Sequence, residues 1–155
     1  MAMKSMKKIV LFLAILAGVS FPGQAGAEGI NWVSYPEGIT RAARSQHPVM
    51  LYFYSHSCRV CAVLDQKVLS DPEIIGYLNV NLVPVKANMA QERELVTSYR
   101  VFGSPTIYFL KPDSTPIDFF AGYVEPDKFL NIIRYIGEKA YEKTTYEDYL
   151  RKKGK

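Results

Sequence analysis

Cys58 and Cys61 are the two cysteines of the chain, and two residues separate them in the pattern C-x-x-C. They follow an apolar run, residues 48–54, that predicts a buried strand, and they begin a segment of helical periodicity. The first turn of a helix carries unpaired N–H groups and a partial positive charge, which favour a thiolate over a thiol. The arrangement indicates dithiol–disulfide exchange. We expect Cys58 to attack, and Cys61, three residues further on the same helical face, to resolve the product.

Two neighbours of the pair are candidates for tuning its chemistry. Arg59 places a cation beside Cys58, which should lower the pKa of that thiol and make the disulfide easier to reduce. His56 is an acid–base candidate and an electrostatic neighbour of the sulfur, but the same residue is also typical of a plain polar loop. The sequence leaves both interpretations of His56 open.

The same residues also suggest a metal site. His56, Cys58 and Cys61 supply three borderline or soft ligands, whereas a closed zinc site needs four and the other histidine, His47, precedes the central strand. Copper(I) needs only two thiolates, so a copper-binding or copper-delivery module is the alternative function. A non-catalytic docking adaptor is a third hypothesis. Exchange chemistry itself requires neither a metal nor an organic cofactor, and we predict none.

The N-terminus has the features of a secretory signal peptide. Three lysines between positions 4 and 8 precede an apolar core, residues 9–19, and Ala25-Gly26-Ala27 forms an A-x-A cleavage signal. We therefore expect residues 1–27 to be removed, a mature chain beginning at Glu28, and a periplasmic or secreted location. The apolar core is shorter than the roughly 20 residues of a membrane span, so the mature form should not cross a membrane. An uncleaved N-terminal anchor is the alternative.

The mature chain is one domain of ordinary size with nearly balanced charge. Removing the leader leaves 128 residues and lowers the basic residues from 19 to 16 against 15 acidic ones. The net charge of +4 thus derives largely from the leader and gives no support to nucleic-acid binding. One fold fills the chain without a dimerisation domain, so we expect a monomer.

Hydrophobic periodicity predicts an α/β domain over residues 28–141, with a central mixed sheet flanked by helices. Residues 30–35 fit an edge strand or a packed N-terminal arm. Residues 142–155 form a C-terminal basic tail, whose last residues, 151–155, are expected to lie in water. In the helix after the cysteines, Asp65 is predicted to face water. Further helices are expected over about 36–46, 59–69, 73–78, 88–99 and 125–139, and strands over 48–54, 80–86, 106–110 and 116–120.

This element order, with C-x-x-C after the central strand and Ser104-Pro105-Thr106 before the next-to-last strand, resembles the thioredoxin fold over about residues 30–140. Local patterns resemble the exported thioredoxin-like domains related to the C-terminal domain of DsbD-type thiol:disulfide interchange proteins. The resemblance implies a redox-active disulfide between Cys58 and Cys61. It implies that protein thiols and disulfides are the substrates, and that a membrane or soluble redox partner exchanges electrons with the pair. The patterns concerned are residues 31–35, 48–54, 68–73 and 82–86.

The resemblance also implies a partner groove beside the cysteines. By that comparison Pro105 is a cis-proline facing the pair, and Gly103 and Ser104 shape the groove. The backbone of Ser104 would pair with a substrate chain in a short strand-like contact. A reductase or general interchange protein is favoured, while the direction of electron flow stays open.

Three positions depart from the family pattern. Ser57 stands where a tryptophan commonly precedes the first cysteine, and Ala62 where a lysine commonly follows the second. Tyr52 replaces a buried acid, six residues before the first cysteine, that helps move protons to the second. His56, Tyr52 or water are the candidate replacements for that acid.

Overall fold

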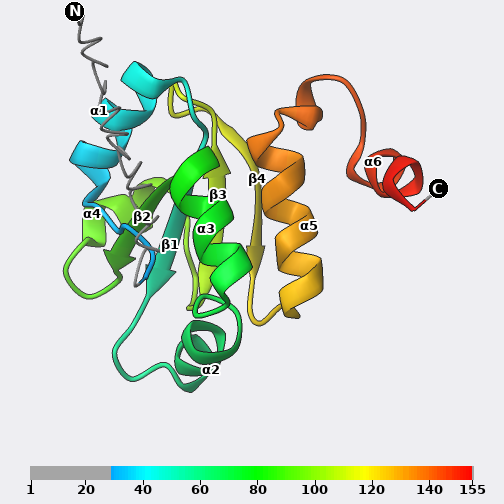
Figure 1. Cartoon of the computed structure of the whole chain (residues 1–155). Coiled ribbons are helices and arrows are strands. Elements are labelled where there is room, and N and C mark those ends of the chain that lie inside the picture. The colour runs from blue at the N-terminus through cyan, green and yellow to red at the C-terminus, as the bar shows by residue number, and fades with distance from the viewer. Residues whose placement is uncertain (1–28, 155) are drawn as a thin grey trace, which may run out of the picture.

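The computed structural model describes residues 29–154, so the predicted leader lies outside the described residues. Four strands form one mixed sheet in the order β2-β1-β3-β4 (Figure 1). Strand β1 pairs in parallel with β2 and antiparallel with β3, and β3 pairs antiparallel with β4. The strands are β1 (Val49–Tyr54), β2 (Val83–Asn88), β3 (Thr106–Leu110) and β4 (Pro116–Ala121).

Helices cover both faces of this sheet, as the sequence predicts. Side chains of α1 and α4 pack into the core of one face, and those of α2, α3 and α5 into the core of the other. A short 3-10 turn, η1, and a last helix, α6, follow α5 (Figure 1). The helices are α1 (Tyr35–Ser45), α2 (Arg59–Lys67), α3 (Pro72–Asn81), α4 (Arg93–Ser98), α5 (Pro126–Gly137), η1 (Ala140–Glu142) and α6 (Tyr146–Lys153).

Strand β1 is the central strand and explains where the cysteines lie. Its first five residues are fully buried. A neighbouring strand lies along each edge of β1, and a layer of helices covers each of its two faces. Met50 and Tyr52 belong to the core under α2, α3 and α5, while Leu51 and Phe53 belong to the opposite core. Such burial on both faces accounts for the unbroken apolar run in the sequence. The chain leaves the C-terminal end of this strand at Tyr54 and enters α2 at Arg59.

Two predicted boundaries are wrong. Helix α3 continues to Asn81, so β2 begins at Val83 and not at residue 80. A run of apolar residues does not by itself distinguish a helix end from a strand start. Helix α4 begins at Arg93 and not at residue 88, because Asn88 is the last residue of β2 and its side chain accepts a hydrogen bond from the amide of Ala90, 2.9 Å away. Asparagine stabilises a turn in this way.

The first described segment is a packed arm with a single bridge. Val33 forms an isolated parallel bridge with Val85, through hydrogen bonds of 3.0 Å to Pro84 and 3.3 Å from Lys86. Of the two alternatives for residues 30–35, the packed arm is therefore the one observed. The arm places Trp32 against the core beneath α2.

The C-terminal tail contains a helix, α6, that the sequence interpretation did not predict, while residues 151–154 are exposed as expected. Helix α6 packs Tyr149 against Tyr135 of α5, with ring centroids 5.3 Å apart, and Tyr149 is only 6% exposed. Its hydroxyl donates to Glu138 at 3.0 Å, and Lys153 makes an ion pair with the same carboxylate at 2.8 Å. The lysines and tyrosines of this segment thus dock the helix.

Candidate active site

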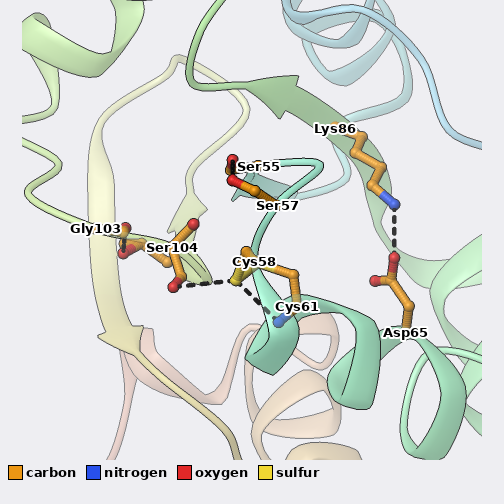
Figure 2. The surroundings of a disulfide bond; sticks show 9 residues. Ser55, Ser57, Cys58, Cys61, Asp65, Lys86, Gly103 and Ser104 are labelled. Carbon is orange, nitrogen blue, oxygen red and sulfur yellow. Dashed lines mark hydrogen bonds and ion pairs between the residues drawn. A yellow bond between two sulfur atoms is a disulfide. The ribbon is translucent and has the colours of Figure 1, made fainter.

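The two cysteine sulfurs are bonded to one another at the start of α2. Cys58 is the N-cap residue of this helix, and its sulfur accepts a hydrogen bond of 3.0 Å from the backbone N–H of Cys61 (Figure 2). The two Cα atoms are 5.2 Å apart. When the bond is reduced, the same N–H and the positive end of the helix dipole favour a thiolate at Cys58.

The two sulfurs differ in access. Cys61 is 3% exposed and packs in the core with Leu64 and Met50, whereas Cys58 is only partly buried. An incoming thiol or disulfide can therefore reach Cys58 from solvent and cannot reach Cys61 directly. This is the asymmetry that separates an attacking sulfur from a resolving sulfur.

The loop before β3 lies against the reactive sulfur. The Ser104–Pro105 peptide bond is cis, and the carbonyl oxygen of Ser104 is 3.3 Å from the sulfur of Cys58 (Figure 2). In the disulfide this sulfur carries no hydrogen, so the approach is a contact, and the reduced thiol can donate a hydrogen bond along it. The Thr106 hydroxyl donates to Gly103 at 2.7 Å, which ties the loop to β3.

A second connection fixes the same loop from β4. The N–H of Gly122 donates to the carbonyl of Pro105 at 2.8 Å. Gly122 has φ of +95°, a conformation that favours glycine over residues with a side chain. The three loop residues named from the sequence, residues 103–105, are thus held beside Cys58 by two neighbouring strands.

Asp65 faces water only in part, since 40% of its side chain is exposed and the rest is engaged by neighbouring residues. It lies one helical turn after Cys61, which places the two Cβ atoms about 5–6 Å apart. Its Oδ2 accepts from Nζ of Lys86 on β2 at 3.0 Å (Figure 2). Its other carboxylate oxygen is buried without a hydrogen-bond partner among the described residues. The carboxylate therefore lies one helical turn beyond the resolving cysteine and is paired with Lys86.

Aromatic rings surround the lysine of this ion pair. Lys86 Nζ lies 4.6 Å from the ring centroid of Tyr54, 5.1 Å from that of Tyr52 and 5.4 Å from that of Trp32. Cation–π attraction in this setting adds to the ion pair with Asp65 in holding the ammonium group.

Tyr52, which occupies the position of the family's buried acid, is not a proton acceptor. Its side chain is fully buried, and the hydroxyl has no hydrogen-bond partner within residues 29–154. Burial, together with the nearby Asp65 carboxylate, holds the pKa of Tyr52 far above its ordinary value. The tyrosine therefore stays protonated and neutral at physiological pH.

The two predicted tuning residues lie at the surface. His56 is exposed, with its ring edge-on to Tyr54 at 5.4 Å between centroids. Arg59 is exposed in the first turn of α2 and makes no ion pair with another described residue. Within residues 29–154 there is also no group of three or more His, Cys, Asp or Glu side chains that could hold a metal ion.

The sequence interpretation missed Asp65 and Lys86. Asp65 is four residues after Cys61, and this spacing could have indicated the carboxylate, because residues i and i+4 share a helical face. Nothing in the sequence pointed to Lys86, which is 21 residues away on a strand. Only the packing of α2 over β2 brings the two charges together.

A four-stranded mixed sheet that presents a C-x-x-C disulfide at a helix N-terminus, beside a cis-proline loop, defines a domain of the thioredoxin fold. The model of the thioredoxin-like domain family matches residues 35–137. The chain therefore belongs to this family of thiol–disulfide oxidoreductases, and the resemblance seen in the sequence is confirmed.

Comparison with known proteins agrees with this assignment. The thiol:disulfide interchange protein DsbD of Vibrio vulnificus is 30% identical over 103 residues, which are 63% of this chain and 17% of that protein. The chain thus matches about one sixth of the relative's length. A thioredoxin from Thermus thermophilus has a TM-score of 0.64 and 30% identity, covering 70% of this chain and 87% of its own. The oxidised C-terminal domain of Neisseria meningitidis DsbD has a TM-score of 0.58 and 21% identity, covering 65% and 90%.

Proposed function

We propose that this protein is an exported thiol:disulfide interchange protein that acts on partner proteins, with Cys58 as nucleophile and Cys61 as resolving thiol. One observation carries the proposal. The sulfur of Cys58 is accessible, lies at a helix N-terminus 3.0 Å from the N–H of Cys61, and contacts the loop at Ser104, while Cys61 is buried. Export is supported by the leader pattern in residues 1–27. No helix among the described residues is long and apolar enough to cross a membrane.

The exchange proceeds in two balanced steps. The Cys58 thiolate attacks one sulfur of the partner disulfide, that S–S bond breaks, and the partner's second sulfur leaves as a thiolate that takes up a proton. Cys61 then loses its proton and attacks the sulfur of Cys58. The mixed disulfide breaks, the partner leaves as a dithiol, and the pair becomes a disulfide. Two electrons pass to the partner. Before the next turnover, another dithiol protein must supply two electrons to reduce the Cys58–Cys61 disulfide.

We assign proton acceptance from Cys61 to Asp65. Cys61 is buried, so its proton needs an acceptor within the protein before it can attack. The carboxylate of Asp65 is one turn away, has a buried oxygen without a partner in the described part of the chain, and is fixed by Lys86.

The cis-proline loop is the proposed site of partner binding. Gly103, Ser104 and Pro105 stand beside Cys58 and are tied to β3 and β4, so their backbone is fixed before a partner arrives. A partner segment that pairs with this backbone would present its sulfur in line with Cys58. We favour the reductase direction, for which the potential of the pair is the deciding quantity.

Two variants test the assignment of the sulfurs. With a disulfide-linked peptide as substrate, Cys61→Ser should accumulate a covalent mixed disulfide, because the attacking thiol remains and the resolving thiol is gone. Cys58→Ser should form none. Mass spectrometry of the acid-quenched reaction distinguishes the two. Adduct formation by Cys58→Ser at the rate seen with Cys61→Ser would contradict the proposal.

The reduction potential of the wild-type pair tests the direction. Equilibration with glutathione buffers should give a value nearer to the roughly −270 mV of thioredoxin than to the roughly −120 mV of a strong oxidant. A value near −120 mV would indicate an oxidase. If the pair could not be cycled at all, the redox proposal would fail, and titration with copper(I) would test the alternative use of the thiols.

A further inference from the structure

Phe102 stands almost completely in water. It is 97% exposed, whereas the preceding residue, Val101, is buried in the core. Phe102 makes no aromatic pair with any described residue and belongs to neither hydrophobic core. Single exposed apolar residues are common on protein surfaces. The position of this phenylalanine, more than its exposure alone, carries the inference.

The side chain projects from the loop that touches the reactive sulfur. Phe102 precedes Ser104 by two residues, so their Cα atoms are within about 7 Å of one another. The carbonyl of Ser104 is 3.3 Å from the Cys58 sulfur. Phe102 therefore belongs to the loop whose carbonyl at Ser104 contacts the sulfur, two residues before that contact.

Helix α2, which begins at Cys58, also carries exposed apolar side chains. Val60, between the two cysteines, is 44% exposed, and Val63, three residues later on the same helical face, is 39% exposed. We call Phe102, Val60 and Val63 the apolar rim. Residues 101–106 contain no charged side chain, so the loop side of the rim is uncharged.

The reaction determines what covers this rim. Exchange requires a partner sulfur to come within bonding distance of Cys58, so the partner segment that carries this sulfur must lie over the rim in the mixed disulfide. Burial of a phenylalanine that is already free in the unbound protein releases its hydrating water without breaking any internal contact. Aromatic side chains at the centre of an interface are frequent energetic anchors.

We propose that Phe102 is a specificity-determining residue, which selects partner segments with a large apolar side chain beside the reactive cysteine. The proposal rests on the proposed function, because it names the substrate class of the same site. It goes beyond that function because it predicts different rates for protein disulfides that differ only in the residue beside the cysteine. Attack by Cys58 alone would not distinguish them.

The test uses three substrates and the pre-reduced full-length chain. Two are disulfide-linked homodimers of short peptides that differ only in the residue next to cysteine, leucine in one and aspartate in the other. The third is hydroxyethyl disulfide, which is too small to reach the rim. The measured quantity is the second-order rate constant of oxidation of the Cys58–Cys61 pair. Phe102→Ala is compared with Phe102→Leu and with Val80→Ala, a control at an exposed apolar residue of α3.

For the leucine peptide, Phe102→Ala should lower the rate constant about tenfold, as expected when a typical interface anchor is truncated. Hydroxyethyl disulfide should react at the wild-type rate, and the aspartate peptide should change less than twofold. Phe102→Leu and Val80→Ala should leave all three rates near wild type. Equal rates with the two peptides, or equal losses on all three substrates, would overturn the role of Phe102. Failure of the wild-type protein to react even with hydroxyethyl disulfide would instead refute the proposed function.

Discussion

The sulfur of Cys58 sits where three local influences meet. The N–H of Cys61 and the N-terminus of α2 stabilise a negative charge on it, and the neighbouring Arg59 adds a full positive charge at the surface. The carboxylate of Asp65, which we propose as the proton acceptor for the other cysteine, forms an ion pair with Lys86. The side-chain groups, Arg59 and Asp65, can each be removed by one substitution, and each should change a different measurable quantity.

Removing the cation beside the nucleophile should lower the reduction potential. Arg59→Ala destabilises the Cys58 thiolate, so the reduced form becomes less favourable and the potential more negative. Because Arg59 is exposed and screened by water, we expect a change below about 30 mV, which corresponds to a tenfold change in the equilibrium constant. Equilibration with glutathione buffers measures it. Arg59→Lys, which keeps the charge, should stay near wild type, and a potential that rises in the alanine variant would contradict the assignment.

Removing the proposed proton acceptor should slow the second step alone. Asp65→Asn leaves Cys58 and its helix position unchanged but deprives Cys61 of a nearby base. We expect the mixed disulfide to decay about tenfold more slowly. This factor is smaller than a typical general-base contribution. Quenched-flow trapping of the adduct follows both steps. Glu94→Gln on α4 serves as the matched control, and an equal slowing of adduct formation and decay would argue for a merely structural role.

At the scale of elements, α2 and α6 have different kinds of support. Helix α2 is anchored by Cys61 and Leu64 in the main core. Helix α6 lies beyond the matched family domain and docks on α5 through the buried Tyr149 and the Glu138–Lys153 pair. With so few contacts, α6 should be able to open locally while the sheet stays folded.

The docking of α6 should weaken in acid. Burial raises the pKa of Glu138, but hydrogen bonds from Lys153 and Tyr149 outweigh it, so the net pKa is lowered. A lowered folded-state pKa means that this contribution is complete above the unfolded value, about 4.3, and is lost as the pH falls through the folded-state value. With 44% of the Glu138 side chain and 42% of Lys153 exposed, the effect should be about 0.2–1 kcal/mol.

Hydrogen exchange of the α6 amides between pH 5 and 3 checks this expectation. The wild-type protein should lose protection of α6 relative to β1 as the pH falls. Glu138→Gln should start with less protection and change less over the same range. Parallel loss in both proteins would show that another group controls the docking.

At the scale of the whole molecule, the exchange site and the C-terminal helix lie apart. Helix α2 begins at the lower edge of the view in Figure 1, and α6 lies beside α5 at the right. The site is built from the ends of β1 and α2 and from the loop before β3, all inside the matched family domain. Opening of α6 should therefore leave exchange with small disulfides unchanged.

The predicted leader gives a test at this scale. When the full chain is expressed in a bacterial host that exports it, the soluble product should begin at Glu28, because Ala25 and Ala27 fit the small-residue cleavage pattern. Intact-mass measurement of the purified protein checks the cleavage position. Ala27→Leu should block processing. Recovery of the uncut wild-type chain in the membrane fraction would support the N-terminal anchor instead.

The sequence by itself determined the features that depend on local patterns. An unbroken apolar run marked β1 because this strand is covered on both faces. The C-x-x-C spacing placed both sulfurs in one helical turn. The predicted break between the helices over 59–69 and 73–78 is confirmed, and Asp71 there caps the amides of Glu73 and Ile74. Each of these patterns depends on a few neighbouring residues, so it can be recognised without knowing which elements pack against that segment.

Only the tertiary structure decided what neighbouring elements supply to each position. The periodicity of α2 predicts that Asp65 faces water, which holds for part of the side chain, but it does not report the lysine that β2 supplies for the ion pair. The C-terminal residues look like a charged tail until α5 offers Tyr135 and Glu138 as a docking surface. The exposure of Phe102 likewise follows from the path of the loop past Cys58. Contacts between residues far apart in sequence depend on how elements pack, and no pattern within a single element records them.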